Sequence, residues 1–250
     1  MKELLAFAEN ELQLAALAFM GLVYILRIRW LLRFKAGRDR QAPTGRGDTS
    51  PLQGIIYSWA NIAMPWAMES TRKKFFLYIQ FVIFHLSVAA SISMSLVIPY
   101  GPGLMRLPLV VPGLQTLFGA AAIIGCYRFY RRLSNPVMKI ISTPDDLFSL
   151  ALLMVWFVFA FLAAPNRPEQ GEFALIVYFI MTAFFLIYVP FSKISHYLYY
   201  PFTRYYFGKT MGHRGVYPIK RGPQPDGRHE ARGLRLEAEE IQDQTKTMKS

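Results

Sequence analysis

Histidine is the residue type in this sequence whose number and placement point most directly to chemistry. The chain has four histidines, and two of them, His85 and His196, lie within or at the end of long apolar stretches. An ionisable side chain is costly in an apolar environment, so it is by default a candidate for a functional role. Imidazole nitrogens on facing helices can hold the iron of a membrane haem. His85 and His196 are therefore candidate ligands of haem iron.

The neighbours of His85 suit a flat macrocycle, which needs small side chains beside it. The turns that follow His85 supply such residues: Ser87, Ala89, Ala90, Ser91 and Ser93. A second interpretation stays open, in which each of the two histidines only hydrogen-bonds a neighbouring helix. His213 and His229 lie in a basic tail, where we expect solvated surface residues.

Cysteine usage limits the redox chemistry that the chain can perform by itself. Cys126 is the single cysteine. One thiol can build no iron–sulfur cluster, no internal disulfide and no thiolate zinc site. Any iron–sulfur cluster must then belong to a partner subunit, and we expect Cys126 to be a small packing residue of the third helix.

These candidate ligands must be positioned by membrane-spanning helices. Hydrophobic residues make up 53% of the 250 residues, which is too apolar for a water-soluble fold. About 20 apolar residues in a helix cross roughly 30 Å of hydrocarbon. The predicted fold is therefore an all-α integral membrane bundle of five transmembrane helices. These helices are expected near residues 12–34, 75–100, 107–130, 147–164 and 173–200.

The placement of basic residues predicts the orientation of the bundle. Lys and Arg number seven in segment 35–74, four in segment 128–146 and eleven from Lys193 onward, whereas the other two connections hold one each. Basic loops remain on the cytoplasmic side of a membrane. We expect an external N-terminus, a cytoplasmic C-terminus and a basic cytoplasmic tail over residues 206–250 behind a membrane domain of residues 1–205. The net charge of +12 then reflects topology and does not indicate nucleic-acid binding.

Three stretches, taken in order, resemble a known family. FHLSVAA contains His85, RRLSNP and STPDDLFSLALL run from Arg131 to Leu153, and PFSKISH ends at His196 with Pro201 five residues later. They are similar to the cytochrome b (gamma) subunit of respiratory nitrate reductase and to related membrane subunits of heterodisulfide-reductase-like and sulfite-reduction complexes. The resemblance covers most of the five-helix region and implies that His85 and His196 ligate one haem.

The sequence departs from the two-haem pattern of that family. The family has a second histidine ten residues after the first ligand and another eighteen residues before the last. These positions are Ser95 and Tyr178 here. The resemblance therefore implies one haem b, held by His85 and His196 toward the cytoplasmic side. Because His196 comes late in its predicted helix, the two ligands meet at one level only if that helix is long, tilted or bent at Pro190.

The resemblance also implies a function. A haem b membrane subunit of this kind transfers electrons between the quinone pool, menaquinone or ubiquinone, and a cytoplasmic iron–sulfur subunit of an oxidoreductase in the inner membrane. Lys193 and Arg204 are candidate partners of the haem propionates. Arg106, Ser95 and Tyr178 mark a candidate quinone region. Two alternatives from other classes are a haem-free membrane anchor and a small transporter, although the spans offer few polar residues for a transport path.

Overall fold

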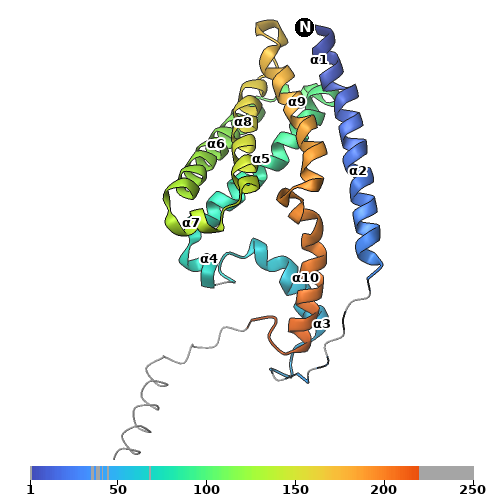
Figure 1. Ribbon diagram of the computed structural model, residues 1–250, viewed down its shortest axis with the longest axis vertical. Helices are drawn as coiled ribbons and strands as arrows, with labels where there is room; N and C mark the ends of the chain where they lie inside the picture. Colours follow the sequence, from blue (N-terminus) through green and yellow to red (C-terminus); the bar gives the residue numbers. More distant parts are fainter. Residues whose placement is uncertain are drawn as a thin grey trace, which may run out of the picture. The chain divides into compact units, whose positions relative to one another are not determined.

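The computed structural model of the protein describes residues 2–34, 37, 40, 42–43, 45–67 and 69–219 (Figure 1). Within this part of the chain every regular element is a helix. Five helices are long and apolar enough to cross a membrane, which confirms the predicted all-α class and identifies a multi-pass membrane protein. These candidate spans are Lys2–Leu32, Phe75–Tyr100, Val110–Ser134, Pro144–Ala163 and Phe173–Phe191.

Four of the spans follow the sequence prediction closely. The first consists of α1 (Lys2–Glu9) and α2 (Glu11–Leu32), and α5 (Phe75–Tyr100) has the predicted bounds. The third and fourth are α6 (Val110–Ser134) and α8 (Pro144–Ala163). Short helical segments connect or flank them: α3 (Pro51–Ala60), η1 (Asn61–Ala63), α4 (Glu69–Lys73), η2 (Pro102–Arg106), α7 (Pro136–Ile141) and η3 (Pro168–Gln170).

The fifth predicted helix, residues 173–200, is interrupted. α9 (Phe173–Tyr188) gives way to two 3₁₀ turns, η4 (Val189–Phe191) and η5 (Lys193–Ser195), and α10 (His196–His213) begins at the second histidine. Pro190 has no backbone N–H to continue the α-helical ladder. Ser192 then adopts an extended conformation, and its hydroxyl accepts a hydrogen bond of 3.2 Å from the backbone N–H of Ile194. The chain therefore changes direction just before His196.

The start of α8 shows why the fourth span begins where it does. Thr143 occupies the N-cap with an extended backbone, and Pro144 is the first helical residue. The backbone N–H of Thr143 donates to Asp146 Oδ2 at 2.8 Å, which is the reciprocal half of a capping box. Asp145 and Asp146 lie in the first turn, where the helix dipole favours negative charge.

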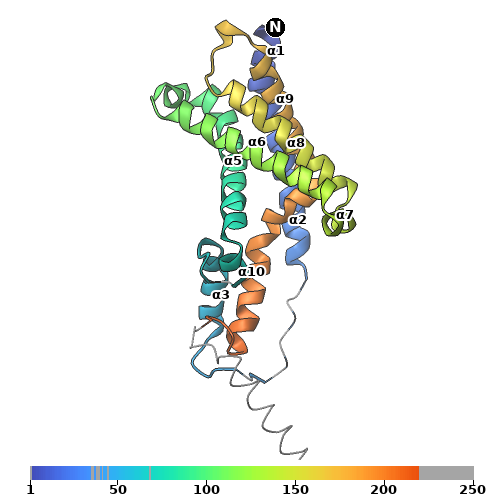
Figure 2. The same cartoon turned by 90° about the vertical axis from the view of Figure 1, so that its left-hand side faces the viewer.

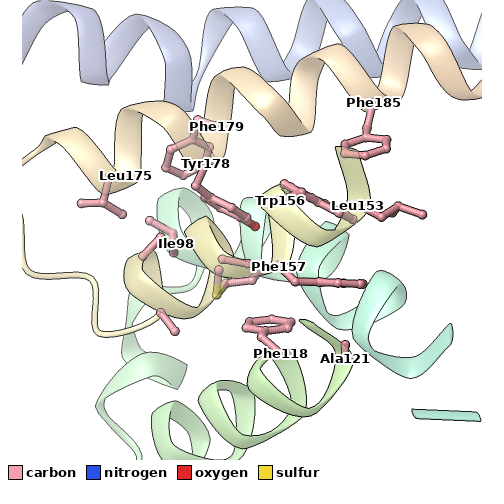
Figure 3. Close-up of a cluster of buried hydrophobic side chains, with 14 of the residues drawn as sticks. Ile98, Phe118, Ala121, Leu153, Trp156, Phe157, Leu175, Tyr178, Phe179 and Phe185 are labelled. Carbon is pink, nitrogen blue, oxygen red and sulfur yellow. The ribbon is translucent and has the colours of Figure 1, made fainter. Parts of the chain in front are cut away.

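The membrane helices pack around a core of aromatic side chains. α6 packs along α8 and against α5, while α9 packs against both α8 and α2 (Figures 1 and 2). The largest fully buried side chains of this core meet between these helices (Figure 3). The indole of Trp156 donates to Thr182 Oγ1 at 2.9 Å, so its one polar group is satisfied in the apolar interior. These large buried rings are Phe118, Trp156, Phe157, Tyr178 and Phe179.

The described part of the chain divides into two compact units, one within residues 2–40 and 59–206 and the other within residues 42–58 and 207–219. The first unit ends at residue 206 and segment 41–58 belongs to the second unit, whereas the division into a membrane domain of residues 1–205 and a cytoplasmic tail stays a prediction. In that unit the α3 and α10 backbones approach closely, because a Cβ built on Gly54 would lie 2.2 Å from the carbonyl oxygen of Gly208. The predicted tail is thus partly folded against the same chain, and its residues 220–250, with His229, lie outside the described part.

Candidate cofactor site

His85 and His196 lie next to each other within the membrane unit. Their ring centres are 6.3 Å apart and the ring planes make an angle of 75°. α5 carries His85, and the turn of the chain at η4 and η5 brings His196, the first residue of α10, to the same level. The level difference expected from an unbroken fifth helix is removed by this interruption. The structure therefore brings the two sequence-predicted ligands together.

Hydrogen bonds orient both rings in the same way. Nδ1 of His85 lies 2.7 Å from the carbonyl oxygen of Phe81, and Nδ1 of His196 lies 3.0 Å from that of Lys193. A carbonyl oxygen can only accept, so Nδ1 must carry the proton in each ring. The neutral imidazole then presents an unprotonated Nε2, which is the form that binds a metal ion.

The separation of the rings suits one metal ion between them. Imidazole nitrogens bind a metal at about 2 Å, so two rings on opposite sides of one ion have centres about 6 Å apart. The observed 6.3 Å has this value. A group of three or more His, Cys, Asp or Glu side chains that could hold a bare metal ion is not found among the described residues. Two imidazoles without further protein ligands fit an ion whose other positions are filled by a macrocycle.

A largely apolar cavity of ≈ 230 Å³ contains both histidines. Both imidazole side chains are exposed to it and are not covered by packing. On α5 its wall continues through Val88 and Ile92, three and seven residues after His85 and so on the same helical face. Apolar walls of this kind exclude water from a bound cofactor. Aliphatic and aromatic side chains from the other helices complete the lining, among them Met20, Leu153, Trp156, Phe185 and Leu186.

The small residues expected beside the macrocycle lie partly elsewhere. Ser87 and Ser91 are buried, and the hydroxyl of Ser87 donates to the carbonyl oxygens of Ile83 at 2.7 Å and Leu117 at 3.1 Å. Ser87 therefore belongs to the contact between α5 and α6. The face of α5 that lines the cavity carries larger side chains, because it is offset from the serine face around the helix.

A second cavity of ≈ 470 Å³ adjoins the first and is basic. Arg128, Arg131 and Arg132, all on α6, line it together with Lys193. The two cavities are adjacent, because four residues line both of them: Arg128, Leu153, Ile194 and His196. The sequence by itself indicates the three arginines only as topological charges. Their spacing of three and four residues, which places them on one helical face, is the signal that could have found this wall.

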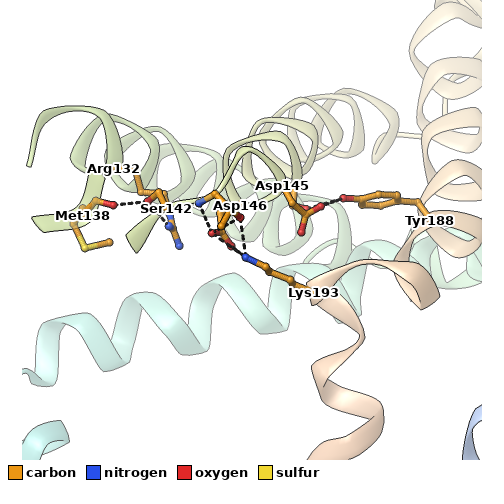
Figure 4. Close-up of polar contacts among 9 residues, drawn as sticks. Arg132, Met138, Ser142, Asp145, Asp146, Tyr188 and Lys193 are labelled. Carbon is orange, nitrogen blue, oxygen red and sulfur yellow. Dashed lines mark hydrogen bonds and ion pairs between the residues drawn. The ribbon is translucent and has the colours of Figure 1, made fainter. Parts of the chain in front are cut away.

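Contacts with the start of α8 hold the interrupted segment on both sides of the break (Figure 4). Before the break, the hydroxyl of Tyr188 donates to Asp145 Oδ1 at 2.7 Å. After it, the ammonium of Lys193 lies 3.2 Å from Asp146 Oδ2 and 2.8 Å from Thr143 Oγ1. These contacts fix the residues that immediately precede His196.

The other predicted site residues are not gathered at the histidine pair. Arg204 is placed with its guanidinium carbon 5.4 Å from the ring centre of Tyr200 and does not line either cavity. Ser95 and Tyr178 are buried in the aromatic core. The hydroxyl of Tyr178 donates to the carbonyl oxygen of Ser91, and that of Ser95 to the carbonyl oxygen of Ile92 at 2.8 Å. Both hydroxyl groups are therefore satisfied by backbone carbonyl oxygens within the core.

Three remaining predictions concern the surface of the chain. Arg106 is exposed at the end of η2. His213 is exposed on α10, as expected for a surface histidine. The prediction that Cys126 is a small packing residue of the third helix is wrong, because its side chain is exposed. α6 buries the face that carries Phe118, Ala121 and Gly125. Cys126 follows Gly125 directly, so its side chain points away from that face.

Comparison with known proteins identifies one relative. No protein-family model matches the chain, and no solved structure matches it. A protein of Nitratidesulfovibrio vulgaris, whose recorded name is only "Protein", is 31% identical over 178 residues that cover 68% of this chain and 74% of the relative. Identity at this level over most of both chains indicates a shared fold and ancestry. The chain therefore belongs to the same family as this Nitratidesulfovibrio vulgaris protein.

Proposed function

We propose that this chain is a membrane cytochrome b subunit that holds one haem b between His85 and His196. The single observation that carries the proposal is the pair of neighbouring imidazoles, whose ring centres are 6.3 Å apart and whose Nδ1 atoms both lie at backbone carbonyl oxygens. When bound, the haem iron supplies one-electron transfer. The chain's own residues orient the ligands and exclude water: Phe81 and Lys193 hold the rings through their carbonyl oxygens, and the apolar cavity encloses the site.

The subunit passes electrons between a lipid quinone, menaquinone or ubiquinone, and an iron–sulfur subunit on the cytoplasmic side. The similarity to the gamma subunit of respiratory nitrate reductases supports this assignment. The single cysteine also supports it, because the chain cannot ligate a cluster and needs a partner that can. In this proposal the chain is the quinone-linked part of an oxidoreductase complex in the inner membrane and is not a complete enzyme alone. Of the three candidate quinone-region residues, Arg106 alone is exposed.

Visible spectroscopy of the purified chain tests the proposal. We expect a low-spin b-type spectrum from the wild type, and loss of bound haem or conversion to a high-spin form in His85→Ala and in His196→Ala. His213→Ala is the matched control and should leave the spectrum unchanged, because His213 is exposed and outside both cavities. A wild-type chain without a haem spectrum, from haem-replete cells, would instead favour the haem-free anchor or the small transporter.

A further inference from the structure

The basic cavity holds three arginines whose charges are not neutralised by the protein. Among the described residues, Arg128, Arg131 and Arg132 form no ion pair with a carboxylate. Arg132 donates to the hydroxyl of Ser142 at 2.8 Å, and the guanidinium carbon of Arg128 lies 5.7 Å from the ring centre of Phe84. These are contacts with a neutral oxygen and an aromatic ring. Their charges remain available to an anion.

The cavity's other charged groups already satisfy each other. Asp146 is its one acidic lining residue, and Asp146 Oδ2 accepts from both the backbone N–H of Thr143 and the ammonium of Lys193. Lys193, which the sequence suggested as an anion partner, is thus already paired. The attraction for an anionic ligand comes from the arginine side of the cavity.

The lining residues of the two adjacent cavities indicate which anion fits. The apolar cavity at the two histidines adjoins the basic one and shares the lining residues Arg128, Leu153, Ile194 and His196 with it. A ligand that extends through both must have an apolar body next to the imidazoles and anionic oxygens on one edge. Arginine guanidinium groups bind carboxylates through parallel, charge-assisted hydrogen bonds.

We propose that Arg128, Arg131 and Arg132 bind the two propionate carboxylates of the haem, which enters with its propionate edge toward α6. This inference rests on the proposed function and replaces Lys193 and Arg204 as the propionate partners. It assigns the orientation of the macrocycle between His85 and His196. The other source of anionic oxygens at such a cavity is the phosphate of an acidic lipid headgroup.

Binding of haem and of its dimethyl ester, in which both propionates are neutral, tests the assignment. The full-length chain is produced without haem, purified in detergent and titrated with each compound. We expect the wild type to bind haem at least about tenfold more tightly than the ester, because charge-assisted hydrogen bonds are lost. The Arg131→Gln/Arg132→Gln variant should lose most of this preference, because only Arg128 of the three arginines remains. Arg131→Lys/Arg132→Lys should retain part of it, because the charge remains.

Arg204→Gln and Arg106→Gln are the matched controls, because these arginines lie outside both cavities, and both should keep the wild-type preference. Equal binding of haem and ester by the wild type, with a low-spin spectrum in each case, would overturn the propionate assignment and leave the histidine ligation intact. A preference of undiminished size in Arg131→Gln/Arg132→Gln would also overturn it. Failure of the wild type to bind either compound would instead contradict the proposed function. Co-purified acidic phospholipid that is lost from the glutamine variant, with the haem preference unchanged, would assign the cavity to lipid phosphate.

Discussion

Lys193 forms an ion pair with Asp146, with 3.2 Å between Lys193 Nζ and Asp146 Oδ2, and the backbone carbonyl of the same lysine lies 3.0 Å from Nδ1 of His196. One residue therefore links the start of α8 to the orientation of a candidate ligand. Its side chain is fixed by the helix cap, and its main chain holds the ring. Mutation of Asp146 should consequently affect His196 without altering either histidine.

The first prediction concerns this link. Asp146→Asn should weaken the contact with Lys193 and loosen η5, so that part of the bound haem becomes high-spin while most of the chain stays folded. Exposed ion pairs contribute up to about 1 kcal/mol, so we expect a partial effect. Electron paramagnetic resonance of the oxidised protein measures the two spin states. Glu69→Gln, which breaks the exposed pair with Lys73 on α4, is the control and should leave the spectrum unchanged.

The second prediction is a stoichiometry of one haem per chain. Tyr178 and Ser95 stand where the resemblance to the gamma subunits would place the outer ligands, and both are buried and hydrogen-bonded in the core. A tyrosine could ligate iron only as a phenolate, whose charge is costly in hydrocarbon. A pyridine haemochrome assay should therefore give a ratio near one, and Tyr178→Phe should not lower it. A ratio near two would contradict the single-site assignment.

The third prediction is the orientation in the membrane. The basic connections predict that segment 35–74 and the C-terminal region lie in the cytoplasm and that the N-terminus lies outside. Reporter fusions after Arg40 and after Ser250 should both report a cytoplasmic location, whereas a fusion after Arg167 should report the opposite side. An external signal from either of the first two fusions would reverse the side on which the haem and the partner are placed.

The fourth prediction is a cytoplasmic partner with iron–sulfur clusters. Cys126 alone cannot ligate a cluster, and its exposed position on α6 leaves it outside the histidine site. Affinity purification from native membranes should recover a second protein together with this chain. The purified complex should contain more iron than its haem accounts for. Recovery of this chain alone, with full haem and full quinol-oxidising activity, would argue against an obligatory partner.

The fifth prediction concerns the contact of α3 with α10. Gly54→Ala should destabilise it, by about 1–3 kcal/mol for an overpacked site, because the new Cβ would lie 2.2 Å from the Gly208 carbonyl oxygen. Proteolysis of segment 45–58 in detergent should become faster. Gly21→Ala is the control, since no atom lies within 4 Å of a Cβ at that position and alanine favours the helix. Equal proteolysis rates in Gly54→Ala and Gly21→Ala would contradict a tight contact between α3 and α10 at Gly54.

The sequence by itself determined the five spans and the candidate ligands. A helix must carry about 20 apolar residues to satisfy its backbone within hydrocarbon, so composition alone locates it. The cap at Thr143 and Pro144 was also predictable from the sequence, because capping depends only on neighbouring residues. His85 and His196 stood out because ionisable residues are rare in such segments.

Only the tertiary structure decided how these parts meet. The sequence permits an unbroken helix over residues 173–200, but Pro190, the Ser192 cap and the contacts with Asp145 and Asp146 together end α9 and start α10 at His196. The arginine wall and the burial of Ser95 and Tyr178 likewise depend on which helix faces which. Contacts between residues far apart in the chain are set by packing of whole helices, and local residue patterns do not specify that packing.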